Sequence, residues 1–115
     1  RQRQMCIRDR SMCVLGMHSE FSRDGIAFNA LWPRTAIATA AVANHLGGDM
    51  MVARSRTVAI MADAAHIILT RDSREHTGNF YVDDDVLAAE GITDLNGYQV
   101  NTELDISELA PDFFV

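Results

Sequence analysis

The chain has 115 residues, of which 48% are hydrophobic and 23% are charged, and its formal net charge is −6. These proportions are close to those of average globular proteins, so they exclude a disordered or a fibrous chain. A chain of this length buries only about two-thirds of its unfolded surface, which limits it to one small domain or to part of a larger one.

The charge is unevenly distributed along the chain. Residues 1–10 contain four Arg and one Asp, so the remaining 105 residues carry a formal net charge of −9. An acidic surface repels nucleic-acid phosphates, and no basic stretch with interleaved aromatic residues follows Arg10, so we expect no nucleic-acid partner. No apolar run approaches the roughly 20 residues of a membrane-spanning helix, and we therefore expect no membrane span.

The first ten residues, RQRQMCIRDR, show neither a helical nor a strand period and do not match the rest of the chain. The string resembles a translated sequencing adapter. Our hypothesis is that residues 1–10 are a foreign or artefactual segment and that the natural sequence is residues 11–115.

The chain contains two cysteines, Cys6 and Cys13, without a Cys-x-x-Cys motif or a paired His. This arrangement indicates neither a zinc site nor a disulfide framework, and it favours a reducing, intracellular compartment. We expect a cytoplasmic protein, with the peroxisome or the mitochondrion as the alternative if the source is eukaryotic.

Residues 11–33 predict one helix and one strand. Residues 11–21 carry apolar side chains every three or four positions, which predicts an amphipathic helix with Cys13 in the core beside its apolar face. Residues 26–32, IAFNALW, form a short apolar run that predicts a buried strand. Pro33 ends this strand because it cannot donate to the ladder.

Two helices are predicted in the middle of the chain. Thr39 can cap a short helix that continues to about Leu46, and Gly47 and Gly48 end it. Residues 49–56 are ambiguous. The apolar pattern over residues 58–70 follows the helical period most clearly.

A second strand is predicted over residues 78–82, followed by three acidic residues. Residues 88–115 contain turn signals and the apolar end Phe113–Val115, which we expect to pack over the sheet or against a partner. Strand, helical crossover and strand form a βαβ unit, whose strands are parallel. Two strands cannot cover their own faces and edges, so this α/β unit is expected to be part of a larger doubly wound fold.

Two stretches, NALWPRTAIATAA (Asn29–Ala41) and TGNFYVDDDVL (Thr77–Leu87), resemble the short-chain dehydrogenase/reductase family. In that family a strand ends in Asn, followed by Pro-Gly and by a loop in which Ile or Val precedes Thr. The matching positions here are Asn29, Pro33, Ile37 and Thr39. The resemblance covers nearly everything after Arg10. It implies that residues 11–115 are the C-terminal portion of a Rossmann-type doubly wound fold, with its last two parallel strands and flanking helices.

The resemblance implies that the loop after the first strand binds NAD or NADP, with the backbone of Ile37 facing the nicotinamide carboxamide. The candidate cofactor-binding residues are Pro33, Arg34, Thr35, Ile37 and Thr39. Arg34 stands where the family has glycine, and the spacing from Pro33 to Ile37 is one residue longer. Arg34 is therefore either a solvated loop residue or a group that attracts a phosphate or an acidic substrate.

The family uses a Tyr general acid/base with a Lys four residues later. Here the aligned positions fall at about Arg3 and Ile7, the chain contains no Lys, and its only tyrosines are Tyr81 and Tyr98. The glycine-rich phosphate loop is absent as well. The resemblance thus implies an NAD(P)-dependent parent enzyme that acts on an alcohol or ketone, including lipid- or steroid-like ones, and forms a homo-oligomer. We expect this chain to contain no catalytic residue and to be inactive alone.

The alternative hypothesis is a non-enzymatic, acidic interaction or lipid-contact module. Upstream sequence discriminates between the two, because a preceding Tyr-x-x-x-Lys would favour the enzyme.

Three smaller features leave alternatives open. Asp83–Asp85 form either a solvated strand exit or a cation site. The four His are scattered, so no metal site is expected, and His66 is interpreted as a surface or interface residue. Met50 and Met51 either fill gaps in the core or form a flexible lid over a lipid-like substrate.

Overall fold

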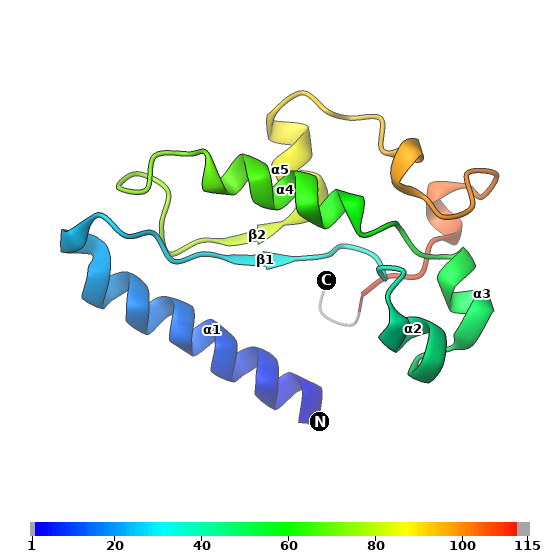
Figure 1. Cartoon of the computed structure of the whole chain (residues 1–115), viewed down its shortest axis with the longest axis horizontal. Coiled ribbons are helices and arrows are strands. Elements are labelled where there is room, and N and C mark those ends of the chain that lie inside the picture. Colours follow the sequence, from blue (N-terminus) through cyan, green and yellow to red (C-terminus); the bar gives the residue numbers. More distant parts are fainter. Residues whose placement is uncertain (1, 113–115) are drawn as a thin grey trace.

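The computed structural model describes residues 2–112, in which two parallel strands are joined and flanked by helices (Figure 1). Strand β1 (Ala30–Trp32) pairs with β2 (Phe80–Val82), with Ala30 opposite Phe80 and Trp32 opposite Val82. This arrangement confirms the predicted α/β class and the parallel pair. The predicted apolar end Phe113–Val115 lies outside the described residues.

Both strands are shorter than the sequence predicts, because side chains take over the pairing before β1 begins. The Phe28 N–H donates to the Thr77 hydroxyl at 3.0 Å, and the Asn79 N–H donates to the Asn29 side chain at 3.0 Å. The Asn29 amide group in turn donates to the His76 carbonyl at 2.9 Å. Together with the backbone bond from the Gly78 N–H to the Phe28 carbonyl at 2.8 Å, these bonds hold residues 28–29 beside residues 76–79.

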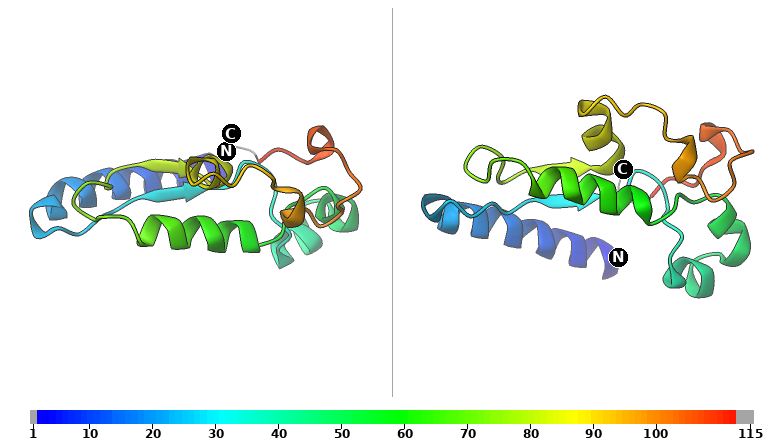
Figure 2. Two further views of the ribbon diagram at one scale, coloured as in Figure 1. Left: turned by 90° about the horizontal axis from the view of Figure 1, so that it is seen from above. Right: turned by 45° about the horizontal axis from the view of Figure 1, so that its top comes forward.

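Helix α1 (Gln2–Phe21) begins well before residue 11, where the sequence predicts a helix start. It runs beside β1, on the side away from β2, and its first turns diverge from the strand (Figures 1 and 2). It meets the rest of the protein through Phe21, whose ring lies 5.5 Å from that of Phe28, and through His18, whose Nδ1 lies 3.0 Å from the Thr77 hydroxyl. The predicted core position of Cys13 is therefore wrong, because Cys13 is exposed.

Helix α4 (Ala59–Leu69) forms the crossover between the strands, as the apolar period predicts, and packs against α5 (Asp83–Ala89). The core lies between them and is built around the buried side chains of Ile37, Ile60 and Leu87. Burying each such side chain contributes roughly 1.5–3 kcal/mol. Since Ile37 belongs to the loop after β1, the core directly supports that loop.

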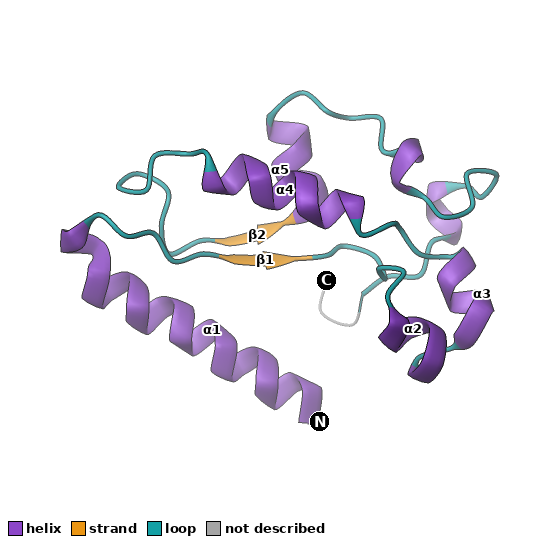
Figure 3. Ribbon diagram, viewed as in Figure 1, coloured by secondary structure: helices purple, strands orange, loops and turns teal. Residues whose placement is uncertain are grey.

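Two short helices follow the loop after β1 (Figure 3). The Thr39 hydroxyl caps α2 (Ala40–His45) by accepting the Val42 N–H at 3.4 Å, as predicted. Gly47 adopts φ +126° directly after α2, a conformation that only glycine takes easily. The ambiguous stretch contains α3 (Gly48–Ala53), on which 80% of Met50 is exposed. The interpretation of Met50 as a core residue is therefore wrong.

Short 3₁₀ helices occur in the remaining segments: η1 (Ser22–Asp24), η2 (Asn96–Tyr98) and η3 (Ile106–Glu108). Leu109 and Ala110 are buried, so the segment after η3 returns to the body of the protein. Within residues 2–112, no helix combines the length and the apolarity that crossing a membrane requires.

Candidate functional site

The loop after β1, residues 33–39, contains all five candidate cofactor-binding residues. Isolated bridges connect it to two other segments, from Thr35 to Pro111 and from Ile37 to Arg56. Every second N–H group of the loop donates into the protein: that of Arg34 to the Asp83 carboxylate (3.0 Å), that of Ala36 to the Ala110 carbonyl (2.8 Å) and that of Ala38 to the Arg56 carbonyl (2.9 Å).

This alternation leaves the other edge of the loop open. In an extended segment, the N–H and C=O groups of one residue point to the same side and those of the next residue to the opposite side. In the bridge to Arg56, the hydrogen bonds are made by the residues on either side of Ile37 and not by Ile37 itself. Within residues 2–112, the N–H and C=O groups of Ile37 have no hydrogen-bond partner. Ile37 as a whole residue is buried, with 9% of its surface exposed. Ile37 therefore offers one donor and one acceptor on a firmly held backbone.

The other candidate residues take different positions along the loop. Pro33 is half-buried directly after β1, Thr35 is buried, and Thr39 is exposed at the start of α2. The hydroxyl proton of Thr39 stays available, because this hydroxyl serves α2 as an acceptor. In open α/β sheets ligands bind beyond the carboxyl ends of the strands, which is where this loop lies.

Arg34 is a loop residue whose side chain is 39% exposed and is also engaged by acidic neighbours. Its Nε lies 3.0 Å from Asp84 Oδ2 and its Nη2 lies 2.9 Å from Asp85 Oδ2. These acidic neighbours, above all the hydrogen bond with Asp84, raise the pKa of Arg34. Two carboxylates already neutralise the guanidinium, which makes it a weak site for a phosphate or an acidic substrate.

Asp83 differs from the solvated strand exit that the sequence suggests, because its side chain is completely buried. The three acidic residues begin α5, where negative charge is favoured by the helix dipole. Asp83 Oδ1 accepts the N–H groups of Arg34 (3.0 Å) and Asp84 (2.7 Å). Burial raises the pKa of Asp83, while these two hydrogen bonds and the positive charge of Arg56 oppose the rise.

The acidic triplet does not form the cation site that was the alternative. In the part of the chain that the structure describes, no group of three or more His, Cys or acidic residues is arranged to hold a metal ion. Asp84 and Asp85 are turned to Arg34, and Asp83 is turned to the loop backbone.

Arg56 is a residue that the sequence analysis missed. Only 3% of it is exposed, although nothing in the ambiguous stretch before it indicates a buried charge. Its backbone holds the loop through the Ala36 carbonyl and the Ala38 N–H, each at 2.9 Å. A pattern of single residues cannot reveal this position, since it depends on three segments that meet only in the folded protein.

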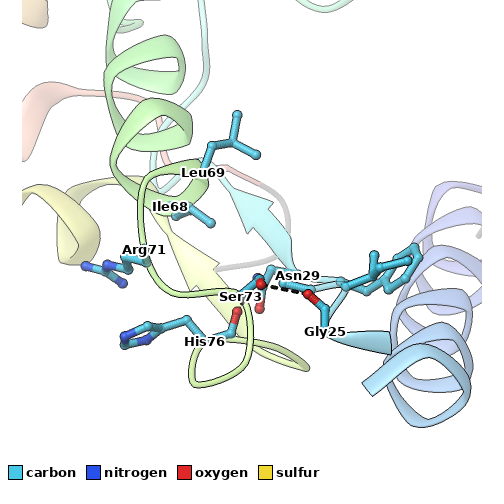
Figure 4. A pocket seen from close by; sticks show the side chains of 10 residues that line it. Gly25, Asn29, Ile68, Leu69, Arg71, Ser73 and His76 are labelled. Carbon is cyan, nitrogen blue, oxygen red and sulfur yellow. Dashed lines mark hydrogen bonds between the residues drawn. The ribbon is translucent and has the colours of Figure 1, made fainter. Parts of the chain in front are cut away.

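A hollow of about 510 Å³ lies at the opposite end of the strands, where β1 begins (Figure 4). Ile68 and Leu69 at the end of α4 stand on one side, and Gly25 and Asn29 stand on the other. Its polar groups are largely paired within the protein, as in the bond from the Ser73 hydroxyl to the Gly25 carbonyl at 2.6 Å. A smaller, more apolar hollow of about 180 Å³ shares Asn29, Ile68 and Leu69 with it.

Comparison with known proteins gives a consistent set of relatives. No protein-family model matches the sequence. Hydroxysteroid dehydrogenase-like protein 2 is 49% identical in Xenopus tropicalis, 50% in Danio rerio and 45% in Homo sapiens, over 105 residues in each case. These alignments cover 91% of this chain and 24% of each relative, so the chain spans about a quarter of the length of the curated relatives it matches.

Two solved structures share the fold at high sequence identity. A dehydrogenase from Xanthomonas campestris superposes with a TM-score of 0.80 at 48% identity, covering 91% of this chain and 37% of that one. A short chain dehydrogenase from Mycobacterium thermoresistibile superposes with a TM-score of 0.76 at 47% identity, covering 91% and 36%. By sequence and by fold, this chain is therefore a homologue of the short-chain dehydrogenases and matches the C-terminal part of their Rossmann-like structure.

Proposed function

We propose that this chain supplies the nicotinamide-side loop of an NAD(P)-dependent short-chain oxidoreductase. The observation that supports this proposal is the open backbone edge of Ile37 at the carboxyl end of β1. A primary carboxamide is planar and has one acceptor oxygen and a donor NH₂ group, which complements a neighbouring N–H and C=O. When bound, the nicotinamide ring would exchange a hydride with an alcohol or ketone.

Each candidate residue of the loop has a different role in this proposal. Ile37 donates its N–H to the carboxamide oxygen and accepts from the carboxamide NH₂. Thr39 lies two residues further on, with a hydroxyl proton available for a second polar contact. Pro33 and Thr35 shape the loop, while Arg34 is held by Asp84 and Asp85 and does not serve the cofactor phosphates.

The proposal assigns the chemical steps to residues outside this chain. The sequence contains no Lys and therefore no Tyr-x-x-x-Lys, and it contains no glycine-rich phosphate loop. We infer that this chain alone binds a dinucleotide weakly and transfers no hydride. The complete enzyme would act on an alcohol or ketone, with lipid- or steroid-like substrates suggested by the name of its relatives, and would form a homo-oligomer.

Nuclear magnetic resonance (NMR) tests this proposal with a pair of ligands that differ in one group. The ¹⁵N-labelled chain is titrated with nicotinamide mononucleotide and, in parallel, with nicotinic acid mononucleotide. The acid carries a carboxylate, which cannot donate to the Ile37 carbonyl. We expect the Ile37 and Thr39 amide signals to shift with the amide ligand and to shift much less with the acid. Equal responses, or shifts only at distant amides, would contradict the proposal.

The second candidate is a non-enzymatic module that contacts an apolar partner or a lipid. It is favoured by apolar side chains left open to solvent, among them Leu69 with 83% and Met12 with 62% exposed. The same titration discriminates between the candidates, because a contact module has no reason to select the carboxamide over the carboxylate.

A further inference from the structure

We propose that Asp83 is the positioning residue of the candidate loop, with Arg56 as its buried counter-charge. This inference rests on the proposed function, since what Asp83 positions is the open backbone edge of Ile37. Asp83 follows β2, whereas the loop follows β1, so only the tertiary structure brings Asp83 to the site.

The parallel register explains how Asp83 reaches the loop. Trp32 is opposite Val82 where the two strands end, so the residues that follow them leave the sheet side by side. Asp83 directly follows Val82, and Arg34 is the second residue after Trp32. Asp83 Oδ1 accepts the Arg34 N–H at 3.0 Å and thus joins the exits of both strands.

The same oxygen also determines how the chain turns after β2. It accepts the Asp84 N–H at 2.7 Å, so one carboxylate oxygen holds the start of α5 and the start of the loop. The outer carboxylates of Asp84 and Asp85 hold the Arg34 side chain at 3.0 and 2.9 Å. Arg34 is therefore restrained at its backbone by a buried group and at its side chain by two more exposed ones.

Arg56 supports the loop from the inner side of Ile37. Its N–H and C=O bond to the residues on either side of Ile37, and the residue is buried, with 3% exposed. Among the described residues its guanidinium makes no ion pair with Asp83, but its positive charge lowers the pKa of Asp83 against the effect of burial. Asp83 and Arg56 thus hold the loop at two points, one before and one at Ile37. Between them the backbone of Ile37 has little freedom to turn its open edge.

The buried polar groups in this layer are only partly satisfied. Within residues 2–112, Thr35 Oγ1, Arg56 Nε and Nη1, and Asp83 Oδ2 are buried without a hydrogen-bond partner. Unpartnered buried polar groups are costly, and a layer selected for stability alone would replace them with apolar side chains. Their presence beneath the loop favours a positioning role over simple packing.

The test compares two substitutions at Asp83 with a matched control. Asp83→Asn keeps an oxygen acceptor for the Arg34 N–H and removes the charge, whereas Asp83→Ala removes both. Asp94→Asn is the control, because Asp94 is exposed and its carboxylate also accepts one backbone N–H, that of Asn96 at 3.1 Å. Amide hydrogen exchange is measured on the full chain for the loop and for α4, whose amides report overall stability.

We expect Asp83→Ala to speed exchange of the Arg34, Ala36 and Ala38 amides by at least about 10-fold, as for loss of a hydrogen bond to a charged acceptor, while α4 is unchanged. Asp83→Asn should restore most of the Arg34 protection, and Asp94→Asn should leave the loop as it is. The Ile37 response to nicotinamide mononucleotide should weaken in Asp83→Ala.

Several results would overturn the inference. Unchanged loop exchange in Asp83→Ala would remove the positioning role, and equal acceleration in the loop and in α4 would make Asp83 a general stability residue. If Asp83→Ala does not fold, Asp83→Asn decides: its Arg34 amide must stay protected while Ala36 and Ala38 exchange faster. If the loop loosens in Asp83→Ala as expected, but the wild-type chain does not respond to nicotinamide mononucleotide, the proposed function alone is refuted. An undiminished Ile37 response in a loosened loop would refute the positioning role alone.

Discussion

The imidazole ring of His18 lies directly against Gly78. A Cβ atom at Gly78 would come within 2.8 Å of His18 Cδ2, and the backbone of Gly78 has φ +73°. The neighbouring Thr77 hydroxyl lies 3.0 Å from His18 Nδ1, so this contact joins α1 to the segment that leads into β2. Gly78 therefore meets two requirements at once, a left-handed backbone and a close approach.

Gly78→Ala should destabilise the chain by about 1–3 kcal/mol, because it adds a clash with His18 to the strain of a positive φ. Gly91→Ala is the matched control, since Gly91 has φ +82° and would bring its Cβ within 4 Å of nothing. Urea denaturation of both variants separates the two effects. Equal losses of unfolding free energy would show that the His18 contact adds nothing.

Truncation of the core beneath the loop should cost more than truncation at the surface. Ile60→Ala removes a side chain with no exposure, and we expect a loss of about 2–5 kcal/mol in unfolding free energy. Leu69→Ala, on the same helix with 83% exposed, should change the unfolding free energy by less than about 0.5 kcal/mol. Chemical denaturation measures both. A similar effect of the two substitutions would mean that α4 does not pack through Ile60.

The Thr39 cap should contribute modestly to α2. Thr39→Ala removes the oxygen that accepts the Val42 N–H at 3.4 Å, a long bond, so the expected loss is about 0.5–1 kcal/mol. Thr39→Ser retains the hydroxyl and should restore most of the unfolding free energy. Failure of Ser to restore it would assign the effect to the Thr39 methyl group instead.

Asp83 should make the unfolding free energy depend on pH with an unusual sign for an Asp. Its folded pKa is raised, mainly by burial, so the folded chain keeps a proton that the unfolded chain has lost. Its contribution is present below the ordinary Asp pKa and is lost as the pH rises through the raised value. The charged groups that face it are Arg34, Asp84 and Arg56.

Urea denaturation between about pH 4 and pH 7 tests this dependence, because an unperturbed Asp has lost its proton near the bottom of that range. Asp83→Asn should remove the fall in stability with rising pH. Asp105 has a lowered pKa through its hydrogen bonds with Ser107, so its contribution is lost only as the pH falls below the ordinary Asp pKa, and Asp105→Asn should leave the slope between about pH 4 and pH 7 nearly unchanged. An Asp83→Asn variant with the wild-type slope would rule out Asp83 as the titrating group.

The origin of residues 1–10 is a separate prediction. Helix α1 runs without a break from Gln2 to Phe21, so its course does not mark a boundary at Arg10. We expect sequencing of the genomic locus to show a different sequence upstream of Ser11, in the same frame and with Tyr-x-x-x-Lys. A locus that encodes RQRQMCIRDR at this place would contradict both the foreign origin and the lost catalytic pair.

The sequence by itself determined several local elements and the resemblance to dehydrogenases, although it did not predict α5 (Asp83–Ala89). The apolar period over residues 58–70, the cap at Thr39 and the stop at Pro33 each depend on neighbours within a few positions, and each appears in the structure. Hydrogen bonds within a helix join residues four apart, so such patterns carry most of the information about it. The stretches around Asn29–Ala41 and Thr77–Leu87 were enough to identify the dehydrogenase relatives.

Only the tertiary structure decided which charged and polar groups meet. Arg34 and Asp83 are 49 positions apart, and no local pattern shows that one buried carboxylate oxygen holds the backbone of the other residue. Cys13 was expected in the core because α1 has an apolar strip, but a strip is buried only where another element covers it. The open edge of Ile37 likewise depends on the pairing of its neighbours with Arg56, because only the folded chain decides that its N–H and C=O have no partner among residues 2–112.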